Sequence, residues 1–380
     1  EDEAHRLRVY IQAKKADAGD DDDSPDNLFW ERRPLATLRS QQHLAVASLI
    51  HVADKLLRTG FVLRQGGAFF NWSGTGGAGK TVCLHTCAYA LCRFAESRGM
   101  TYWEKFAMVY APTGTAGRKA GGRTNHSGWK LPLMGYHHTD DLSDVRRGQL
   151  QAELLYTWFL LFDEKSMMGL NQVGAIDTRA DDAFPDSVGR SEGLFDPFGD
   201  GRRYEPIPRH ELPPRPEPAE LPKRMGLRKF AAVVFIGDLG QLPPVFDSTW
   251  YAQDAKVTTR LARRGRGVLE SIDFSVTLNE NMRQAGADAF ADLCWRAHEG
   301  EFIAPDWPTL NRRALPYLPA GSAEPFLTAL QLHARNKTAT ASNMRNFCAG
   351  VALADRPDGI PAENHPVPRF APPAPLRGAL

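Results

Sequence analysis

The sequence lacks three features that would each point to a particular class of protein. It has no apolar run near the roughly 18 residues of a membrane-spanning helix, and no signal-peptide core near its first residue. Its five cysteines form neither an even disulfide framework nor a C-x-x-C metal pattern, which favours a reducing compartment. We therefore expect an intracellular protein without a membrane partner, placed in the nucleus or mitochondrion if the source is eukaryotic.

An excess of one charge is also missing. Lys and Arg total 46 and Asp and Glu total 45, so no overall basic field indicates a nucleic-acid partner, and such a partner must be met locally. What the chain does have is size, because 380 residues with 42% hydrophobic content can bury a sizeable core in two or three domains. Cys83, Cys87 and Cys92 fall on one predicted helix, where we interpret them as buried packing residues rather than metal ligands.

Residues 74–81, with the sequence GTGGAGKT, fit the G-x-x-x-x-G-K-[ST] pattern of a phosphate-binding loop. Glycines in such a loop let consecutive backbone N–H groups turn toward phosphate oxygens. Residues 67–72 predict a short buried strand and residues 81–97 an amphipathic helix, a context that a merely flexible glycine-rich turn would not require. We expect Lys80 to reach the terminal phosphates and the Thr81 hydroxyl to bind Mg²⁺. The rest of the cradle consists of Gly74, Thr75, Gly76, Gly77, Ala78 and Gly79.

Three further apolar segments predict buried parallel strands. They are FAMVYAPTGTAG from Phe106, WFLLFDEKSMM from Trp158 and FAAVVFIGDLGQLPPV from Phe230. In an open parallel sheet the loops after the carboxyl ends of the strands line the ligand crevice, so these ends and the phosphate loop should converge. Helical periodicity is expected over residues 38–60 and through most of the chain after Pro244, including residues 276–301.

Polar residues beyond the phosphate loop have the chemistry of nucleotide hydrolysis. Asp163 and Glu164 end a predicted strand, where the first suits Mg²⁺, usually held through water, and the second suits polarising the water that attacks a γ-phosphate. Gln241 is an amide able to hydrogen-bond the γ-phosphate or that water, while Asp238 could simply cap the turn. Arg283 could stabilise charge on phosphoryl oxygens, although an arginine in a helical stretch is usually a surface residue.

Biased composition marks three other stretches. Residues 1–34 contain an acidic run, which we interpret as a solvated, disordered tail rather than a partner site. Residues 181–229 are rich in Pro, Gly, Arg and Asp and predict a largely disordered inserted loop; contact of its arginines with a nucleic-acid backbone is the second possibility. Residues 355–380 form another Pro-rich tail.

Taken together and in order, GTGGAGKT, APTGTAG with GGRTNHSGWKLP, DEKSM, GDLGQLPPV and LNENMRQ resemble the Pif-type DNA helicases of superfamily 1B, named for petite integration frequency. The resemblance covers roughly residues 35–300 and is specific, because G-D-x-x-Q-L-P-P-V is not general to P-loop proteins. It implies an α/β fold, a RecA-like P-loop NTPase domain with a mainly parallel sheet. It also implies hydrolysis of ATP with Mg²⁺ and 5′ to 3′ stepping along single-stranded DNA. Helicase halves of rolling-circle (Helitron) transposases are similar, and that origin stays open.

The same resemblance implies roles for individual residues. Adenine recognition falls on Gln42, with neighbouring Gln41 as the alternative register. The nucleotide-site roles fall on Gly79, Lys80, Thr81, Asp163, Glu164, Gln241 and Arg283. Contacts to single-stranded DNA fall on Pro112, Thr113, Gly114, Thr115, His126 and Ser127. Backbone N–H groups and hydroxyls suit phosphates without reading sequence, and for His126 a purely structural role is the alternative.

Departures from the family pattern qualify these implications. Lys165 replaces the usual apolar residue of D-E-I-S-M, and Leu239–Gly240 stand where bulky aromatics are common; we expect both to change packing more than chemistry. Residues 301–354 resemble the beginning of a second RecA-like domain, but no T-x-H-K-x-Q-G or A-L-S-R segment follows.

The hypothesis is therefore the N-terminal motor portion, or a truncated member, of an ATP-dependent 5′–3′ DNA helicase. The implied substrates are single-stranded DNA, DNA junctions and tailed duplexes, in DNA repair, recombination or telomere maintenance. The rival hypothesis is a non-catalytic, nucleotide-dependent DNA-binding module. No feature of the sequence indicates an oligomeric state.

Overall fold

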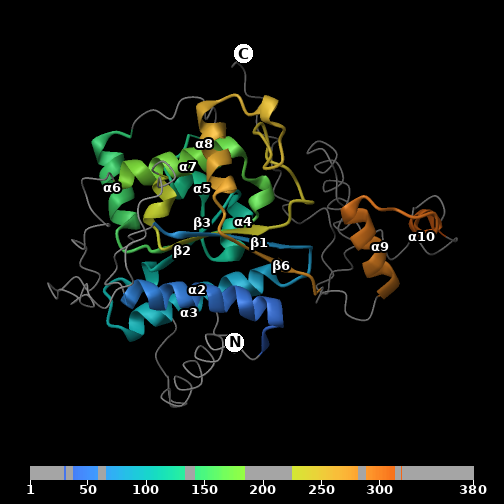
Figure 1. The fold of residues 1–380 in the computed structure, drawn as a ribbon, viewed down its shortest axis with the longest axis horizontal. Helices are drawn as coiled ribbons and strands as arrows, with labels where there is room; N and C mark the ends of the chain where they lie inside the picture. The colour runs from blue at the N-terminus through green and yellow to red at the C-terminus, as the bar shows by residue number, and fades with distance from the viewer. Residues whose placement is uncertain are drawn as a thin grey trace, which may run out of the picture. The chain divides into compact units, whose positions relative to one another are not determined.

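The computed structural model describes residues 30, 37–58, 66–132, 142–184, 225–280, 288–312 and 318 (Figure 1). The chain divides into two units, Glu1–Glu301 and Phe302–Leu380. Arg283, most of residues 181–229 and both predicted tails lie outside the described residues, apart from Trp30. Among the residues described, no helix is both long enough and apolar enough to cross a bilayer.

The first unit is built on a six-stranded sheet in which every pairing is parallel, with the strand order β3-β2-β4-β5-β1-β6. Its strands are β1 (Ala68–Gly74), β2 (Ala107–Ala111), β3 (Arg123–Thr124), β4 (Phe159–Phe162), β5 (Ala232–Gly237) and β6 (Phe274–Leu278). Every residue of β4 and β5 is buried, which explains why these central strands read as continuous apolar runs. The predicted α/β fold with a mainly parallel sheet is confirmed.

Helices cover both faces of this sheet (Figure 1). One face carries α2 (Ser40–Arg58) and α3 (Lys80–Ser97), and the other carries α6 (Asp144–Leu154), α7 (Leu170–Ala183) and α8 (Arg260–Glu270). Short helices follow β2 and β3, namely α4 (Gly114–Ala120) and α5 (Asn125–Gly128), and α9 (Asp288–Glu299) follows β6. Short 3₁₀ turns occupy Trp103–Lys105, Lys165–Met167, Gly226–Lys229 and Asp254–Lys256.

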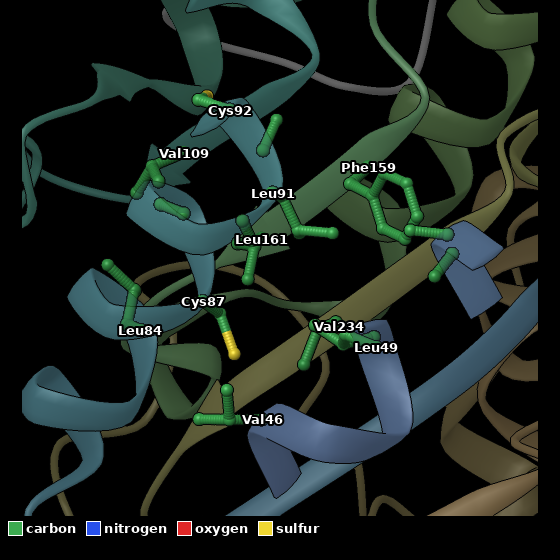
Figure 2. Close-up of a cluster of buried hydrophobic side chains, with 14 of the residues drawn as sticks. Val46, Leu49, Leu84, Cys87, Leu91, Cys92, Val109, Phe159, Leu161 and Val234 are labelled. Atoms are coloured by element: carbon green, nitrogen blue, oxygen red, sulfur yellow. The ribbon is translucent and has the colours of Figure 1, made fainter. Parts of the chain in front are cut away.

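The core under α2 and α3 is a continuous apolar cluster, part of which is drawn in Figure 2. Side chains of both helices and of β2, β4 and β5 meet in it, among them Val46, Leu49, Leu84, Leu91, Val109, Leu161 and Val234. Cys83, Cys87 and Cys92 are fully buried in the same cluster, as predicted for packing residues. Burial raises the pKa of the Cys83 thiol to about 12, so it stays protonated and unreactive at neutral pH.

The predicted strands and helices are largely confirmed, but the two edge strands were missed. The prediction of helix over residues 276–301 is wrong at its start, because residues 274–278 form β6, and α9 begins only at Asp288. Within the described part of the chain β6 pairs with β1 alone, and its first four residues are exposed or half-buried. An edge strand of this kind carries no buried apolar run, so the signal that identified the central strands is absent.

The structure describes both ends of the segment predicted as an insertion. Residues Asp181 to Ala183 finish α7, and the 3₁₀ turn Gly226–Lys229 leads toward β5. The Lys229 ammonium lies 2.7 Å from an Asp181 carboxylate oxygen, so the two ends of the segment lie side by side.

In the second unit the described residues are 302–312 and 318. They include the short helix α10 (Asp306–Asn311), whose first residue accepts a hydrogen bond from the Ile303 N–H at 3.0 Å. The rings of Phe302 and Trp307 stack with centroids 5.1 Å apart. Whether this unit begins a second RecA-like domain stays a prediction.

Candidate nucleotide and DNA site

The strand order brings the predicted nucleotide residues to one edge of the sheet. β5 lies between β4 and β1, and all three strands are parallel. The segments that follow them, residues 163–164, 238–241 and 74–81, therefore leave at the same edge. The predicted convergence of strand ends with the phosphate loop is confirmed.

The phosphate loop connects the end of β1 to the first turn of α3, as its motif predicts. Gly77 and Gly79 have φ values of 91° and 81°, in the left-handed region that glycine adopts without strain. At Gly79 space is also limited, since a Cβ there would lie 2.2 Å from Nε2 of Gln42. A side chain at this position would therefore strain the backbone and force the Gln42 amide to move, before any phosphate arrives.

Lys80 lies over the loop that precedes it. Its ammonium donates hydrogen bonds to the carbonyl oxygens of Gly74, at 2.6 Å, and Thr75, at 3.0 Å. Thr81 follows on the first turn of α3 and is half-buried. Both side chains thus come from the same helix end, where backbone N–H groups and the helix dipole favour an anion.

Gln42, on the first turn of α2, supports the phosphate loop from one side. Its Nε2 donates to the Ala78 carbonyl at 3.2 Å, and its Oε1 accepts from the Arg39 N–H at 3.0 Å. The neighbouring Gln41 instead accepts a hydrogen bond from the Asn279 N–H at 2.8 Å. The structure therefore brings Gln42 rather than Gln41 to the loop, while adenine recognition by Gln42 stays a prediction.

Asp163 and Glu164 directly follow β4. Asp163 is buried, and burial raises the pKa of its carboxyl to about 6, although the positive charge of Lys80 acts in the opposite direction. Glu164 is half-buried and has a φ of 52°, which is unusual for a residue other than glycine. Non-glycine residues held in this region often occupy functional sites, where the surrounding structure maintains the strain.

Lys165 has a more polar role than the sequence interpretation gave it. Its side chain is fully buried, and its ammonium donates to Asn71 Oδ1 at 2.5 Å, Ser73 Oγ at 2.6 Å and the Trp72 carbonyl at 3.0 Å. Burial, followed by the charge of Lys80, lowers the pKa of Lys165 to about 7. The residue after the paired carboxylates is thus hydrogen-bonded to the strand that carries the phosphate loop.

Gln241 lies in the turn after β5, and Asp238 organises that turn. The Asp238 carboxylate accepts hydrogen bonds from the Gly240 N–H at 3.0 Å and from Gln241 Nε2 at 3.3 Å. The capping role considered for Asp238 is therefore what the structure shows. Gln241 itself is exposed, with its amide held by Asp238.

The residues predicted to contact DNA lie on the β2–β3 side of the sheet. Thr113 caps α4, because its Oγ1 accepts from the Ala116 N–H at 3.2 Å, so its hydroxyl already has a structural role. The other members range from half-buried (Pro112, His126) to exposed (Gly114, Thr115, Ser127). Burial lowers the pKa of His126, which keeps its imidazole neutral at pH 7.

A polar network joins this side of the sheet to the loop after Gln241. Asn125 of α5 donates to Gln172 Oε1 at 3.0 Å, and the Gln172 N–H donates to Asp247 at 3.0 Å. Asp247 also accepts from the Asn171 N–H at 3.1 Å and so caps the start of α7. Sequence reasoning missed Asp247 and Gln172, because nothing in a single sequence shows which remote segment caps a helix.

Residues 51–199 match the family model described as PIF1-like helicase. Over these residues the chain is similar to PIF1-like helicases. It contains the phosphate loop, the predicted DNA-contact segments and the pair Asp163 and Glu164. The turn that holds Gln241 lies beyond the matched residues, so its relation to PIF1-like helicases depends on its motif and its place in the fold.

Two solved structures illustrate the likeness. The Pif1 helicase from Candida albicans is 20% identical, with 82% of this chain and 54% of that chain covered and a TM-score of 0.50. The Pif1 helicase from Bacteroides in complex with ADP-AlF3 and ssDNA is 18% identical, with 80% and 56% covered and a TM-score of 0.42. The chain thus spans about half the length of these structures, and the first of them shows the same fold. No curated protein matches the chain.

Proposed function

We propose that this chain is the ATP-hydrolysing motor part of a DNA helicase that moves 5′ to 3′ along single-stranded DNA. The observation that carries the proposal is the placement of three segments at one edge of a parallel sheet. They are the phosphate loop with Lys80, the pair Asp163 and Glu164, and the turn with Gln241. The family match of residues 51–199 supports the proposal.

In this site the protein's own residues bind and orient the nucleotide. The N–H groups of residues 76–81 and the Lys80 ammonium bind phosphate oxygens, which replace the Gly74 and Thr75 carbonyls as partners of Lys80. Glu164 orients the attacking water, and Gln241 hydrogen-bonds the γ-phosphate or that water. Arg283, which lies outside the described residues, is proposed to stabilise charge on the phosphoryl oxygens.

Mg²⁺ fits the pair Thr81 and Asp163. Asp163 is a buried carboxylate whose raised pKa reflects the cost of desolvating its charge, and a bound cation would offset that cost. Thr81 provides a hydroxyl at the start of α3. When bound, the ion supplies neutralisation of charge on the β- and γ-phosphates.

Single-stranded DNA is proposed to bind beside the nucleotide, across the residues after β2 and β3. Exposed Arg118 and Lys119 lie on α4 and give this side local positive charge in a nearly neutral chain, whereas the nearby Arg123 is ion-paired with Glu153 at 3.1 Å. Backbone phosphates are suited to such groups, to hydroxyls and to free N–H donors, and such contacts do not select a sequence. The Bacteroides structure bound to ADP-AlF3 and ssDNA gives a precedent within PIF1-like helicases for both ligands.

The DNA substrates, the cellular pathways and the location of the protein belong to the same proposal. They are action on DNA junctions and tailed duplexes in repair, recombination or telomere maintenance, and a nuclear or mitochondrial location in a eukaryote. A helicase fragment of a rolling-circle transposase and a non-catalytic, nucleotide-dependent DNA-binding module are the alternatives. Turnover separates the motor from the non-catalytic module.

Substitution Glu164→Gln tests the proposal. It should lower the rate of ATP hydrolysis roughly 10²-fold or more while leaving ATP affinity nearly unchanged, because Glu164 orients water rather than holding the nucleotide. Phosphate release by residues 1–380 with saturating single-stranded DNA gives the rate, and calorimetry gives the affinity. Glu270→Gln, the same change at an exposed residue of α8, is the matched control. Wild-type protein that binds ATP and DNA without turnover would support the non-catalytic module instead.

A further inference from the structure

The end of helix α9 meets the turn that holds Gln241. His298 Nε2 lies 2.7 Å from Asp238 Oδ1, and His298 Nδ1 lies 2.9 Å from Glu299 Oε1. The imidazole also stacks on Trp295, with centroids 5.9 Å apart. Since a carboxylate oxygen only accepts, each ring nitrogen has to donate for both contacts to form, which requires the charged imidazolium.

Asp238 shares its carboxylate between His298 and its own turn. Only 5% of its side chain is exposed, and the oxygen that meets His298 also accepts from the Gly240 N–H at 3.0 Å. Its other oxygen accepts from Gln241 Nε2 at 3.3 Å. The Gln241 amide is thus connected to α9 through one buried carboxylate.

Glycine at position 240 makes room for this contact. A Cβ built at Gly240 would lie 2.4 Å from His298 Nε2 and 2.6 Å from His298 Cδ2. Position 240 therefore carries no side chain, and the imidazole from α9 occupies the space beside it. This is a second, independent observation, because it concerns shape rather than charge.

We propose that His298 is a positioning residue for Gln241. By holding Asp238, His298 fixes the orientation of the Gln241 amide. Helix α9 and the turn after β5 therefore move together when the γ-phosphate binds. The inference rests on the proposed function, in which Gln241 hydrogen-bonds the γ-phosphate, a group that a nucleoside triphosphate has and a diphosphate lacks.

The charged groups around the contact give it a pH dependence. Asp238, from the end of β5, and Glu299, from α9 itself, face the imidazole; the hydrogen bond to Asp238 raises the pKa of His298 above its ordinary 6.5, although burial opposes this. Burial acts to raise the pKa of Asp238, but hydrogen bonds from His298 and Gly240 and the charge of Lys80 leave it lowered. The contact is complete at pH 6.5 and below, down to the pKa of Asp238, and is lost as pH rises through the raised pKa of His298.

Three variants of the 380-residue chain test the inference. Calorimetry measures the affinity for a non-hydrolysable ATP analogue and for ADP, near pH 6 and near pH 9. The readout is the affinity for the ATP analogue divided by the affinity for ADP. His298→Ala and Gly240→Ala, the second of which displaces the ring without removing it, should each lower this ratio roughly three- to tenfold near pH 6, with ADP affinity unchanged. His298→Gln, which keeps a donor in place of Nε2, should retain the ratio and show a smaller change of the ratio with pH than the wild type, because only Asp163 and Lys165 of the site still titrate in this range.

The inference is overturned if His298→Ala and Gly240→Ala keep the wild-type ratio at both pH values. It is also overturned if both variants weaken ADP and the ATP analogue equally, because that result marks a merely structural role. Lys80→Ala separates this failure from failure of the proposed function. If Lys80→Ala binds the ATP analogue as tightly as wild type, the assignment of the nucleotide site itself is wrong. If Lys80→Ala binds the analogue more weakly, only the role proposed for His298 is wrong.

Discussion

Gly79 of the phosphate loop lies beside Gln42 of helix α2. Its φ of 81° and the 2.2 Å approach of Gln42 Nε2 to a Cβ built there are two separate demands for glycine. The first is implied by the motif, since glycine-rich phosphate loops need such conformations. The second depends on a residue 37 positions earlier in the chain, which the motif does not specify.

Substitution Gly79→Ala should therefore destabilise the fold more than Gly99→Ala does. Gly99 also has a positive φ, of 70°, but a Cβ there would meet nothing within 4 Å. Both changes cost about 1–2 kcal/mol for the left-handed backbone, and Gly79→Ala adds about 1 kcal/mol because Gln42 must give up its hydrogen bond to Ala78. Urea unfolding of both variants measures the difference. In a Gln42→Ala background the excess should disappear; an excess that persists would show that Gln42 is not its cause.

Other residues of the site could be predicted only in part. Lys80, Asp163 and Glu164 were found because each stands at a fixed place relative to a glycine loop or to the end of an apolar strand. Lys165 and His298 were not given their roles, because their partners are Asn71 and Asp238, 94 and 60 residues away. The only signal in the sequence was a departure from the family pattern. For Lys165 the departure is at the residue itself, and for His298 it is at its neighbour in space, Gly240.

At the scale of elements, α7 and α8 cross with their backbones in close contact. A Cβ at Gly265 would lie 2.0 Å from the Leu170 carbonyl oxygen, and a Cβ at Gly174 would lie 2.0 Å from the Leu261 carbonyl oxygen. At the same crossing Arg264 of α8 forms an ion pair with Asp177 of α7, with 2.5 Å between Arg264 Nε and Asp177 Oδ2. Because the first turn of α7 is capped by Asp247 from the loop after Gln241, the crossing also helps to hold that loop in place.

Substitution Gly265→Ala should push these helices apart and lower the free energy of unfolding by about 1–3 kcal/mol, since the atoms in the way belong to backbone. Gly148→Ala in α6 is the matched control, because a Cβ there meets nothing within 4 Å. Alanine at that exposed helical position should raise stability by about 0.5–1 kcal/mol. Thermal unfolding distinguishes the expected loss of stability in Gly265→Ala from the expected gain in Gly148→Ala. Equal effects of both substitutions would contradict the close crossing.

The elements themselves were predictable where burial is complete. β1, β2, β4 and β5 read as apolar runs because helices cover both faces of the sheet, whereas β3 and β6 lie at its edges and gave no such signal. The crossing of α7 and α8 was not predictable, because a glycine in a helix shows no partner in a single sequence. Helical periodicity still placed α2 within two residues of its observed start.

At the scale of the whole molecule, the parallel sheet determines where function is located. Once β1, β4 and β5 are parallel neighbours, the segments that follow them share an edge whatever their distance along the chain. The sequence predicted parallel strands whose following segments converge, but only the structure showed that β1, β4 and β5 are neighbours. The chain covers 54% of the Candida albicans helicase structure. Its fold brings together the candidate nucleotide-site residues, apart from Arg283, which lies outside the described residues.

The most direct test of this account is a calorimetric titration of residues 1–380 with ATP and Mg²⁺, in the wild type and in Lys80→Ala. Loss of a charged group that hydrogen-bonds the phosphates should weaken binding at least about tenfold. Lys55→Ala, which removes the same charge from an exposed position on α2, should bind ATP as the wild type does. Equal affinity of wild type and Lys80→Ala, with both folded by circular dichroism, would contradict the assignment of the nucleotide site.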